Sequence, residues 1–383
     1  MNLIKKFKKD YNKKPEKFFD CGGRFEILGN HTDHNHGLCL AATASLAITC
    51  ALSIRDDNII NVDSIGFSKI KVDLSTLDYI ENENKSAAMI RGVAKYFADH
   101  GYKICGFDAV LTSTIFPGAG VSSSAAFELL IAQIFNELFN EGKIDKITLA
   151  KAGQYSENNY YGKASGLLDQ IGVAFGNTVE IDFKDIANPS VKSIDFPFDD
   201  LCFVGVNTGG DHSSMNKLYS KIPEDMMSAA KKMGVNYLRE SSLETLNQTI
   251  GLTDIEKSRA THFYSENERV LKAIKALESK DKKAFLEQVN GSRISSTNDL
   301  KNMMVEGHYE GSPLEACDRA MSILEDTGAC KINGGGFAGS IICVVPTNMV
   351  KSFTKTMSKF YGKENVVLIN VRKFGPRSFN YED

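Results

Sequence analysis

The chain has 383 residues, of which 42% are hydrophobic and 24% charged, with a formal net charge of −3 and an isoelectric point near 6.2. A globular chain of this length buries enough apolar surface for two cores rather than one. The balanced charge excludes a strongly basic, nucleic-acid-binding surface and an acidic tail, so we expect a small-molecule partner.

The eight cysteines are scattered along the chain, and no two of them form a C-x-x-C pair. This usage is typical of a reduced, cytoplasmic protein whose cysteines are small buried residues. The longest uncharged run, Leu38 to Ile54, is rich in Ala, Ser and Thr. A membrane span needs about 20 strongly apolar residues, so we interpret this run as buried strand and expect neither a membrane segment nor an export signal.

In chain order, residues 1–18 predict a lysine-rich amphipathic helix. Residues 38–73 are rich in β-branched residues and predict several strands separated by turns. The patterns that follow predict a helix over 86–100, a strand over 107–114, helices over 122–140 and 146–161, and strands near 178–183 and 201–208.

The stretch 188–200 holds two prolines and several turn residues, and it predicts a domain boundary. We therefore expect an N-terminal domain over 1–198 and a C-terminal domain over 199–383, with a tail strand that returns to the first domain. Both halves have α+β character. The second half predicts mostly helix over 223–307, then a helix over 313–327, a strand over 340–346, a helix over 347–361 and a strand over 365–371.

The most informative segment, FPGAGVSSSAA, runs from Phe116 to Ala126 between a predicted strand and a predicted helix. Glycines let backbone N–H groups turn toward an anion, and the helix start adds partial positive charge, so the segment suits phosphate binding. Its serines would add hydroxyl donors and one magnesium ligand. It is neither G-x-x-x-x-G-K-[ST] nor G-x-G-x-x-G, and alone it is equally compatible with an ordinary turn whose serine caps the helix.

A second polar segment, GRFEILGNHTDHNHG, runs from Gly23 to Gly37. Sugar hydroxyls both donate and accept, so a sugar site needs carboxylate, amide and imidazole groups on a rigid turn. Asp33 would accept from two hydroxyls, and Asn30 and His31 would hold another. Two alternatives are a solvated loop and a metal-hydrolase site. The ligands of the latter would be His31, His34, His36 and Asp33.

A third segment, GLLDQ, covers Gly166 to Gln170. Its carboxylate, Asp169, follows an apolar pair and precedes a run of small residues, which indicates a partly buried acid. Taken alone, a helix-capping aspartate is the simpler interpretation.

Together these segments resemble the galactokinase branch of the GHMP kinase superfamily. Gly23 to Gly37 is similar to the galactokinase signature G-R-V-N-L-I-G-E-H-T-D-Y-N-G-G, and the serine segment is similar to P-x-G-x-G-L-S-S-S-A-A. Gly166 to Gln170 resembles G-I-M-D-Q, and NGGGFAG, starting at Asn333, resembles T-G-G-G-F-G-G. Weaker matches lie at SENNYYG and ENERV, so the order and spacing hold from about residue 20 to 346.

The resemblance implies a two-domain GHMP kinase fold of the α+β class, with the active site in the interdomain cleft. It implies an ATP-dependent kinase of the C1 hydroxyl of galactose that uses Mg²⁺, with Asp169 as catalytic carboxylate and Arg24 as its partner. We expect a cytoplasmic monomer. The implied binding residues are Asn30, His31, Asp33, Gly166 and Tyr219 for sugar; Pro117, Gly118, Ala119, Gly120, Ser122, Ser123, Ser124 and Gly335 for ATP; and Ser124 and Glu157 for metal.

The sequence departs from the family pattern at several points. Asn30 replaces the signature glutamate and His34 replaces the tyrosine, so we also consider a pocket that accepts a modified hexose such as galacturonate or an amino sugar. Asp211 stands just before His212, at a position where the family usually has a basic residue. This change would place a carboxylate near the expected phosphates. A further alternative is a non-catalytic regulator that binds sugar and ATP, but the loop serines and Asp169, which such a protein would be expected to lose, are intact.

Overall fold

The computed structural model of the chain describes residues 3–116, 118, 120–163, 165–209 and 216–380. These residues form two β-sheets with α-helices packed against both, so the predicted α+β class is confirmed. Within the described segments, none of the helices combines the length and the apolar character that crossing a bilayer requires.

The first sheet has eight strands, and its main path runs β12-β1-β2-β5-β3-β4, with β6 paired to β2 and β7 paired to β6. Neighbouring strands are antiparallel except for β3 and β5, which are parallel. The strands are β1 (Lys17–Leu28), β2 (Leu38–Ile54), β3 (Ile59–Ser64), β4 (Ile70–Asp73), β5 (Phe107–Ser113), β6 (Thr178–Asp182), β7 (Ser190–Ile194) and β12 (Arg377–Phe379).

Strand β2 is buried along most of its length because its two faces enter two different cores. Cys39 and Ala41 belong to the core beneath the helices of the first half. Leu40 and Ala42, which alternate with them, belong to a core shared with the second sheet. Side chains in a strand alternate between its two faces, so this uncharged run fits a strand buried on both sides, as predicted. The helices on the first sheet are α1 (Leu3–Tyr11), α2 (Lys85–Asp99), α3 (Ser123–Phe139), α4 (Lys146–Ser156) and α5 (Leu168–Ala174).

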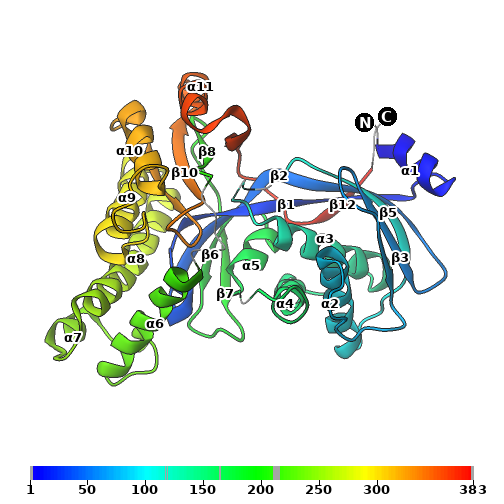
Figure 1. Cartoon of the computed structure of the whole chain (residues 1–383), viewed down its shortest axis with the longest axis horizontal. Helices are drawn as coiled ribbons and strands as arrows, with labels where there is room; N and C mark the ends of the chain where they lie inside the picture. Colours follow the sequence, from blue (N-terminus) through cyan, green and yellow to red (C-terminus); the bar gives the residue numbers. More distant parts are fainter. Residues whose placement is uncertain (1–2, 117, 119, 164, 210–215, 381–383) are drawn as a thin grey trace.

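The second sheet has the order β11-β8-β10-β9, and all its pairs are antiparallel. Figure 1 shows its long helices α8, α9 and α10 on the opposite side of the molecule from α2. The strands are β8 (Leu201–Asn207), β9 (Ala329–Asn333), β10 (Ser340–Pro346) and β11 (Val366–Ile369). The helices are α6 (Asn216–Lys232), α7 (Leu243–Gln248), α8 (Asp254–Ser279), α9 (Lys282–Ser295), α10 (Pro313–Leu324) and α11 (Val350–Tyr361). Short helical turns are η1 (Asp33–Asn35), η2 (Glu157–Tyr161), η4 (Leu238–Glu240), η5 (Ser296–Leu300) and η6 (Lys363–Asn365).

One hydrophobic core joins the two sheets. The rings of Phe25 in β1 and Phe203 in β8 have centroids 4.6 Å apart. Both belong to the same buried cluster as Val270 of α8 and Phe285 of α9. Burying one phenylalanine contributes about 1.5–3 kcal/mol, so side-chain packing stabilises the relative position of the two sheets.

The predicted helix over residues 1–18 is too long, because α1 ends at Tyr11 and β1 begins at Lys17. Asn12 adopts a left-handed conformation, with a φ of 54°, and donates its N–H to the carbonyl of Lys8. This geometry ends helices, and Pro15, which follows, cannot continue the helical hydrogen bonds.

Four further segments differ from the sequence prediction. The predicted helix over 146–161 is α4 followed by the π-helical turn η2, and the predicted boundary segment 188–200 contains strand β7. Strands β1 and β9 were not predicted. The division into domains at 198/199 stays a prediction; this point lies between β7 of the first sheet and β8 of the second. The tail strand β12 pairs with β1.

Candidate active site

The glycine- and serine-rich segment connects β5 to α3 and reaches across to the second sheet. The carbonyl of Gly120 accepts hydrogen bonds from Nη1 of Arg24 at 3.3 Å and from Nδ2 of Asn333 at 2.8 Å. Helix α3 begins at Ser123, which is exposed, so the partially positive helix start is accessible to an anion. Pro117 and Ala119 lie outside the described residues, and their place in ATP binding stays a prediction.

Arg24 of β1 and Asp169 of α5 are 145 positions apart in the chain and lie in direct contact. Nε and Nη2 of Arg24 lie 2.7 and 2.6 Å from Oδ1 of Asp169. The second carboxylate oxygen accepts a hydrogen bond of 2.6 Å from Oγ of Ser122, a residue in a left-handed conformation just before α3. The sequence indicated the first pair and gave no signal for the serine contact.

The environment of Asp169 favours the ionised carboxylate. Burial works to raise the pKa of Asp169, but the charges of Arg24 and Lys163 and the hydrogen bonds from Ser122 and Arg24 outweigh it. The pKa therefore lies below its ordinary value. About 17% of the side chain remains exposed, so the carboxylate is accessible to a small molecule.

The carboxylate of Glu157 is fully buried, and each of its oxygens accepts two hydrogen bonds. Oε1 accepts from Oγ of Ser124 and Nζ of Lys163, both at 2.9 Å. Oε2 accepts from Oγ of Ser165 at 2.7 Å and Nε2 of Gln170 at 2.9 Å. Carboxylate and hydroxyl oxygens are ligands that Mg²⁺ prefers, together with phosphate oxygens and water. The adjacent oxygens of Ser124 and Glu157 therefore fit a magnesium ion. No sequence motif indicated Lys163.

A second buried acid lies behind Glu157. Nε2 of Gln170 also donates to Oε2 of Glu128, at 3.2 Å. Burial and the nearby Glu157 carboxylate raise the pKa of Glu128 to about 9, so this acid is neutral at pH 7 and adds no negative charge.

The predicted sugar residues come from three segments: the polar turn after β1, the residues before α5, and helix α6. Oδ2 of Asp33 lies against Gly166, where an added Cβ would stand only 2.8 Å from it. The ring of Tyr219 in α6 covers Gly335, where an added Cβ would stand 2.0 Å from the ring carbon Cε2. A side chain at either position would therefore displace Asp33 or Tyr219. The ring of Tyr219 also lies 5.2 Å from that of His31, between centroids.

His31 is a neutral imidazole with one open acceptor. Burial lowers the pKa of His31 to about 3. Nε2 lies 2.9 Å from the carbonyl oxygen of Gly335. Because a carbonyl can only accept, Nε2 carries the proton and Nδ1 has a free lone pair. That Nδ1 atom is buried and has no hydrogen-bond partner in the described part of the chain.

The side chain of Asn30 is buried and bonded to the second half of the molecule. Its Nδ2 donates to the carbonyl of Gly334 at 2.9 Å, and its Oδ1 accepts from Nδ2 of Asn302 at 2.9 Å. Asn302 is itself fully buried, and no sequence motif indicated it. Whether Asn30 also meets a sugar stays a prediction.

The metal-hydrolase alternative finds no support in the geometry. In the described residues, no group of three or more His, Cys, Asp or Glu side chains is placed to hold a metal ion. His36 stacks on Tyr237, with centroids 3.6 Å apart, whereas the ring of His34 lies near Asp33 and 5.5 Å from that of His31, between centroids. Asp211 and His212 lie outside the described residues.

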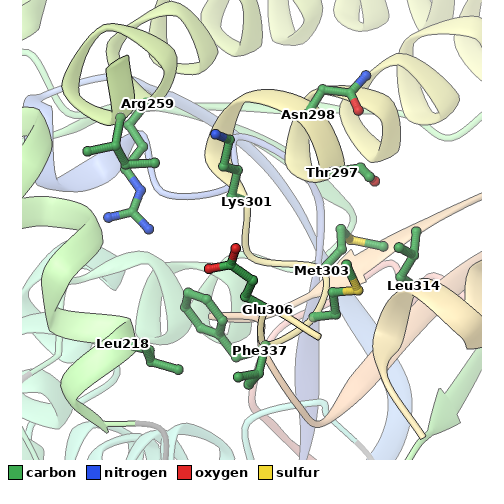
Figure 2. Close-up of a pocket in the computed structure, with 12 residues that line it drawn as sticks. Leu218, Arg259, Thr297, Asn298, Lys301, Met303, Glu306, Leu314 and Phe337 are labelled. Carbon is green, nitrogen blue, oxygen red and sulfur yellow. The ribbon is translucent and has the colours of Figure 1, made fainter. Parts of the chain in front are cut away.

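A pocket of about 600 Å³ lies next to Asn302, the residue that contacts Asn30 in the candidate site. Figure 2 shows Lys301 and Glu306 beside an apolar lining of Met303, Leu314 and Phe337. Lys301 and Met303 flank Asn302 in the chain, so the pocket adjoins the residue that holds Asn30.

Family models match two parts of the chain. The model described as GHMP kinases N terminal domain matches residues 88–177, and the galactokinase galactose-binding signature matches residues 5–54. The first match contains the serine loop and Asp169, and the second contains Arg24 and the polar turn.

Whole-chain comparisons agree with these matches. The chain is 30% identical over 371 residues to a galactokinase of Clostridium tetani, covering 94% of this chain and 92% of that protein. It is 30% identical over 373 residues to a galactokinase of Clostridium perfringens, covering 94% of each. The fold is similar to the crystal structure of Lactococcus lactis galactokinase complexed with galactose, with a TM-score of 0.83, 25% identity and 98% of each chain covered.

Proposed function

Since the chain belongs to the galactokinase family of the GHMP kinases, we propose that it is an ATP-dependent kinase of the C1 hydroxyl of galactose. The observation that carries the proposal is the contact of Asp169 with Arg24 and Ser122, next to the Ser124–Glu157 pair. This arrangement provides a proton acceptor for a hydroxyl beside a group of phosphate and metal ligands, which phosphoryl transfer requires.

Asp169 accepts the proton of the C1 hydroxyl as its oxygen bonds to the γ-phosphorus and the bond from that phosphorus to ADP breaks. The low pKa keeps the carboxylate ionised at neutral pH, ready to orient the hydroxyl. Arg24 holds the carboxylate in place through Nε and Nη2. Most of the rate enhancement in such a site comes from positioning and charge stabilisation.

The ATP phosphates bind at the start of α3, where backbone N–H groups and serine hydroxyls are concentrated. Ser124 and Glu157 would hold Mg²⁺, which when bound would neutralise charge on the phosphates. The residues that we assign to ATP are Pro117, Gly118, Ala119, Gly120, Ser122, Ser123, Ser124 and Gly335.

The sugar binds against Asp33, Gly166 and Tyr219. The carboxylate of Asp33 accepts from sugar hydroxyls, and Nδ1 of His31, buried and without a partner in the described part of the chain, accepts from another. Asn30 contributes to the sugar site through its side-chain amide, whose Oδ1 accepts a hydrogen bond from Asn302.

The test is a substrate panel with ATP consumption as the readout and phosphorus NMR of the product. We expect galactose to be consumed with ATP and to yield galactose 1-phosphate. Efficient turnover of galacturonate or an amino sugar in place of galactose would move the assignment to a modified hexose. Binding of sugar and ATP without any turnover would instead identify a non-catalytic regulator.

A further inference from the structure

Lys163 lies close to both carboxylates of the candidate active site. It follows the turn η2 and Gly162, whose φ is 80°. Its Nζ is 2.9 Å from Oε1 of Glu157. Its charge also acts on Asp169, where it is the second largest favourable charge after Arg24. About 53% of the side chain is exposed, so it is the cation of this cluster that a ligand reaches most easily.

The charges of the cluster show why this lysine matters. The cluster contains the carboxylates of Glu157 and Asp169, and the charges of Arg24 and Lys163 lower the pKa of Asp169. Each nitrogen of the Arg24 guanidinium already has a protein partner, because Nε and Nη2 contact Asp169 and Nη1 donates to the carbonyl of Gly120. The ammonium of Lys163 makes its hydrogen bond at Oε1 of Glu157, the same oxygen that Ser124 contacts and that would help to hold magnesium.

We propose that Lys163 is a further catalytic residue, whose ammonium contacts the γ-phosphoryl group of ATP in the space between Glu157 and Asp169. The inference rests on the proposed function, because that phosphoryl group must pass from the metal ligands to the hydroxyl held at Asp169. As the bond to the C1 oxygen forms and the bond to ADP breaks, negative charge spreads over three phosphoryl oxygens. A flexible four-carbon stem lets the ammonium follow these oxygens and stabilise that charge.

The direct test compares nucleotides that differ only in the γ-phosphoryl group. Calorimetry of the full chain without sugar, with Mg²⁺, gives the affinities for ATP and ADP in the wild type and in Lys163→Met. We expect the variant to lose roughly tenfold in ATP affinity and little in ADP affinity. If Lys163 only holds Glu157 in place, ATP and ADP affinity fall together, and that outcome overturns the proposal.

Kinetics provide the second readout. Lys163→Met should lower kcat by about 100-fold with little change in the KM for the sugar, and Lys163→Arg should recover most of that loss. Lys151→Met is the matched control, because this α4 lysine lies outside the cluster and its Nζ donates to Oδ1 of Asn188. It should leave affinity and kcat unchanged.

The outcomes separate this inference from the proposed function. If the wild type turns over galactose and Lys163→Met keeps the wild-type ATP affinity and kcat, the proposed role of Lys163 is wrong and the proposed function stands. Wild-type binding of ATP without turnover of any sugar removes the proposed function, while the ATP and ADP affinities still decide the lysine contact. A wild-type chain that binds no nucleotide overturns both.

Discussion

The Nζ atom of Lys331 lies 2.7 Å from Oε1 of Glu26, in a buried ion pair that joins β9 of the second sheet to β1 of the first. Neither side chain is more than 6% exposed. Oε2 of the same glutamate lies 3.4 Å from Nδ2 of Asn30, so the pair also supports the polar turn of the candidate site.

Breaking this ion pair should destabilise the fold. Lys331→Met leaves the Glu26 carboxylate buried without its cation, and we expect a loss of about 3–5 kcal/mol in the free energy of unfolding. Urea denaturation at pH 7 measures it. The control is Lys192→Met, which removes an exposed pair with Glu278 and should change the unfolding midpoint little. Equal losses in the two variants would contradict the argument.

Removing the proposed proton acceptor should stop catalysis without unfolding the protein. Asp169→Asn keeps the shape and loses the charge, and we expect kcat to fall by about 1,000-fold. Steady-state kinetics with galactose and ATP measures the loss, and thermal denaturation checks the fold. The control is Asp99→Asn, which changes an exposed aspartate paired with Lys95 and should keep the wild-type kcat and melting temperature. Activity retained in Asp169→Asn would remove this residue from its assigned role.

The pH dependence of the reaction should depend on Arg24. Asp169 accepts a proton only when ionised, so kcat/KM rises with pH as the carboxyl loses its proton. Because Asp169 has a lowered pKa, this rise should lie below the ordinary range for an aspartate. Arg24→Met removes the largest favourable charge while burial remains, so the rise should move to higher pH. The control is Arg377→Met, which removes a pair with Asp20 and should leave the pH profile of kcat/KM unchanged. An unchanged pH profile in Arg24→Met would contradict the role assigned to Arg24.

The same lowered pKa has a consequence for stability. The pair of Asp169 with Arg24 contributes stability above the pKa of an unfolded aspartate, and this contribution is lost as the pH falls through the lower pKa of the folded state. Urea denaturation of the wild type and of Arg24→Met across the acid range should therefore show a difference that shrinks toward low pH.

Asn302 should affect sugar binding more than chemistry. Its Nδ2 contacts Oδ1 of Asn30 and, at 3.2 Å, the carbonyl of Gly335. Asn302→Ala removes these hydrogen bonds to Asn30 and Gly335. We expect the KM for the sugar to rise roughly five- to tenfold, with kcat little changed. Asn298→Ala, at an exposed position on η5, is the control. A fall in kcat at constant KM would place Asn302 in the chemical step instead.

Local patterns predicted several elements closely. The helix expected over 122–140 is α3, Ser123–Phe139, because its apolar periodicity matches the buried face that packs on the first sheet. Strand β1 was missed, because its polar and glycine residues, such as Asp20 and Arg24, conceal a segment that is buried by pairing with β2 and β12. That pairing involves residues far apart in the chain, which a local pattern does not contain.

The ordered motifs led from the sequence to the right family, and the relatives and the fold confirm it. Lys163 and Asn302 had no such signal. Lys163 contacts Glu157 because Gly162, in a left-handed conformation, directs the chain back toward it, and Asn302 contacts Asn30 because η5 ends beside that residue.

The amino-acid sequence by itself determined the chemical groups of this protein: a carboxylate, a guanidinium, a serine-rich helix start and a polar turn, all within short segments whose conformation depends on neighbouring residues. Only the tertiary structure decided which of these groups meet. Ion pairs and hydrogen bonds act over a few ångströms, and the distances between Arg24, Asp169 and Lys163 are set by the packing of sheets and helices distant in sequence.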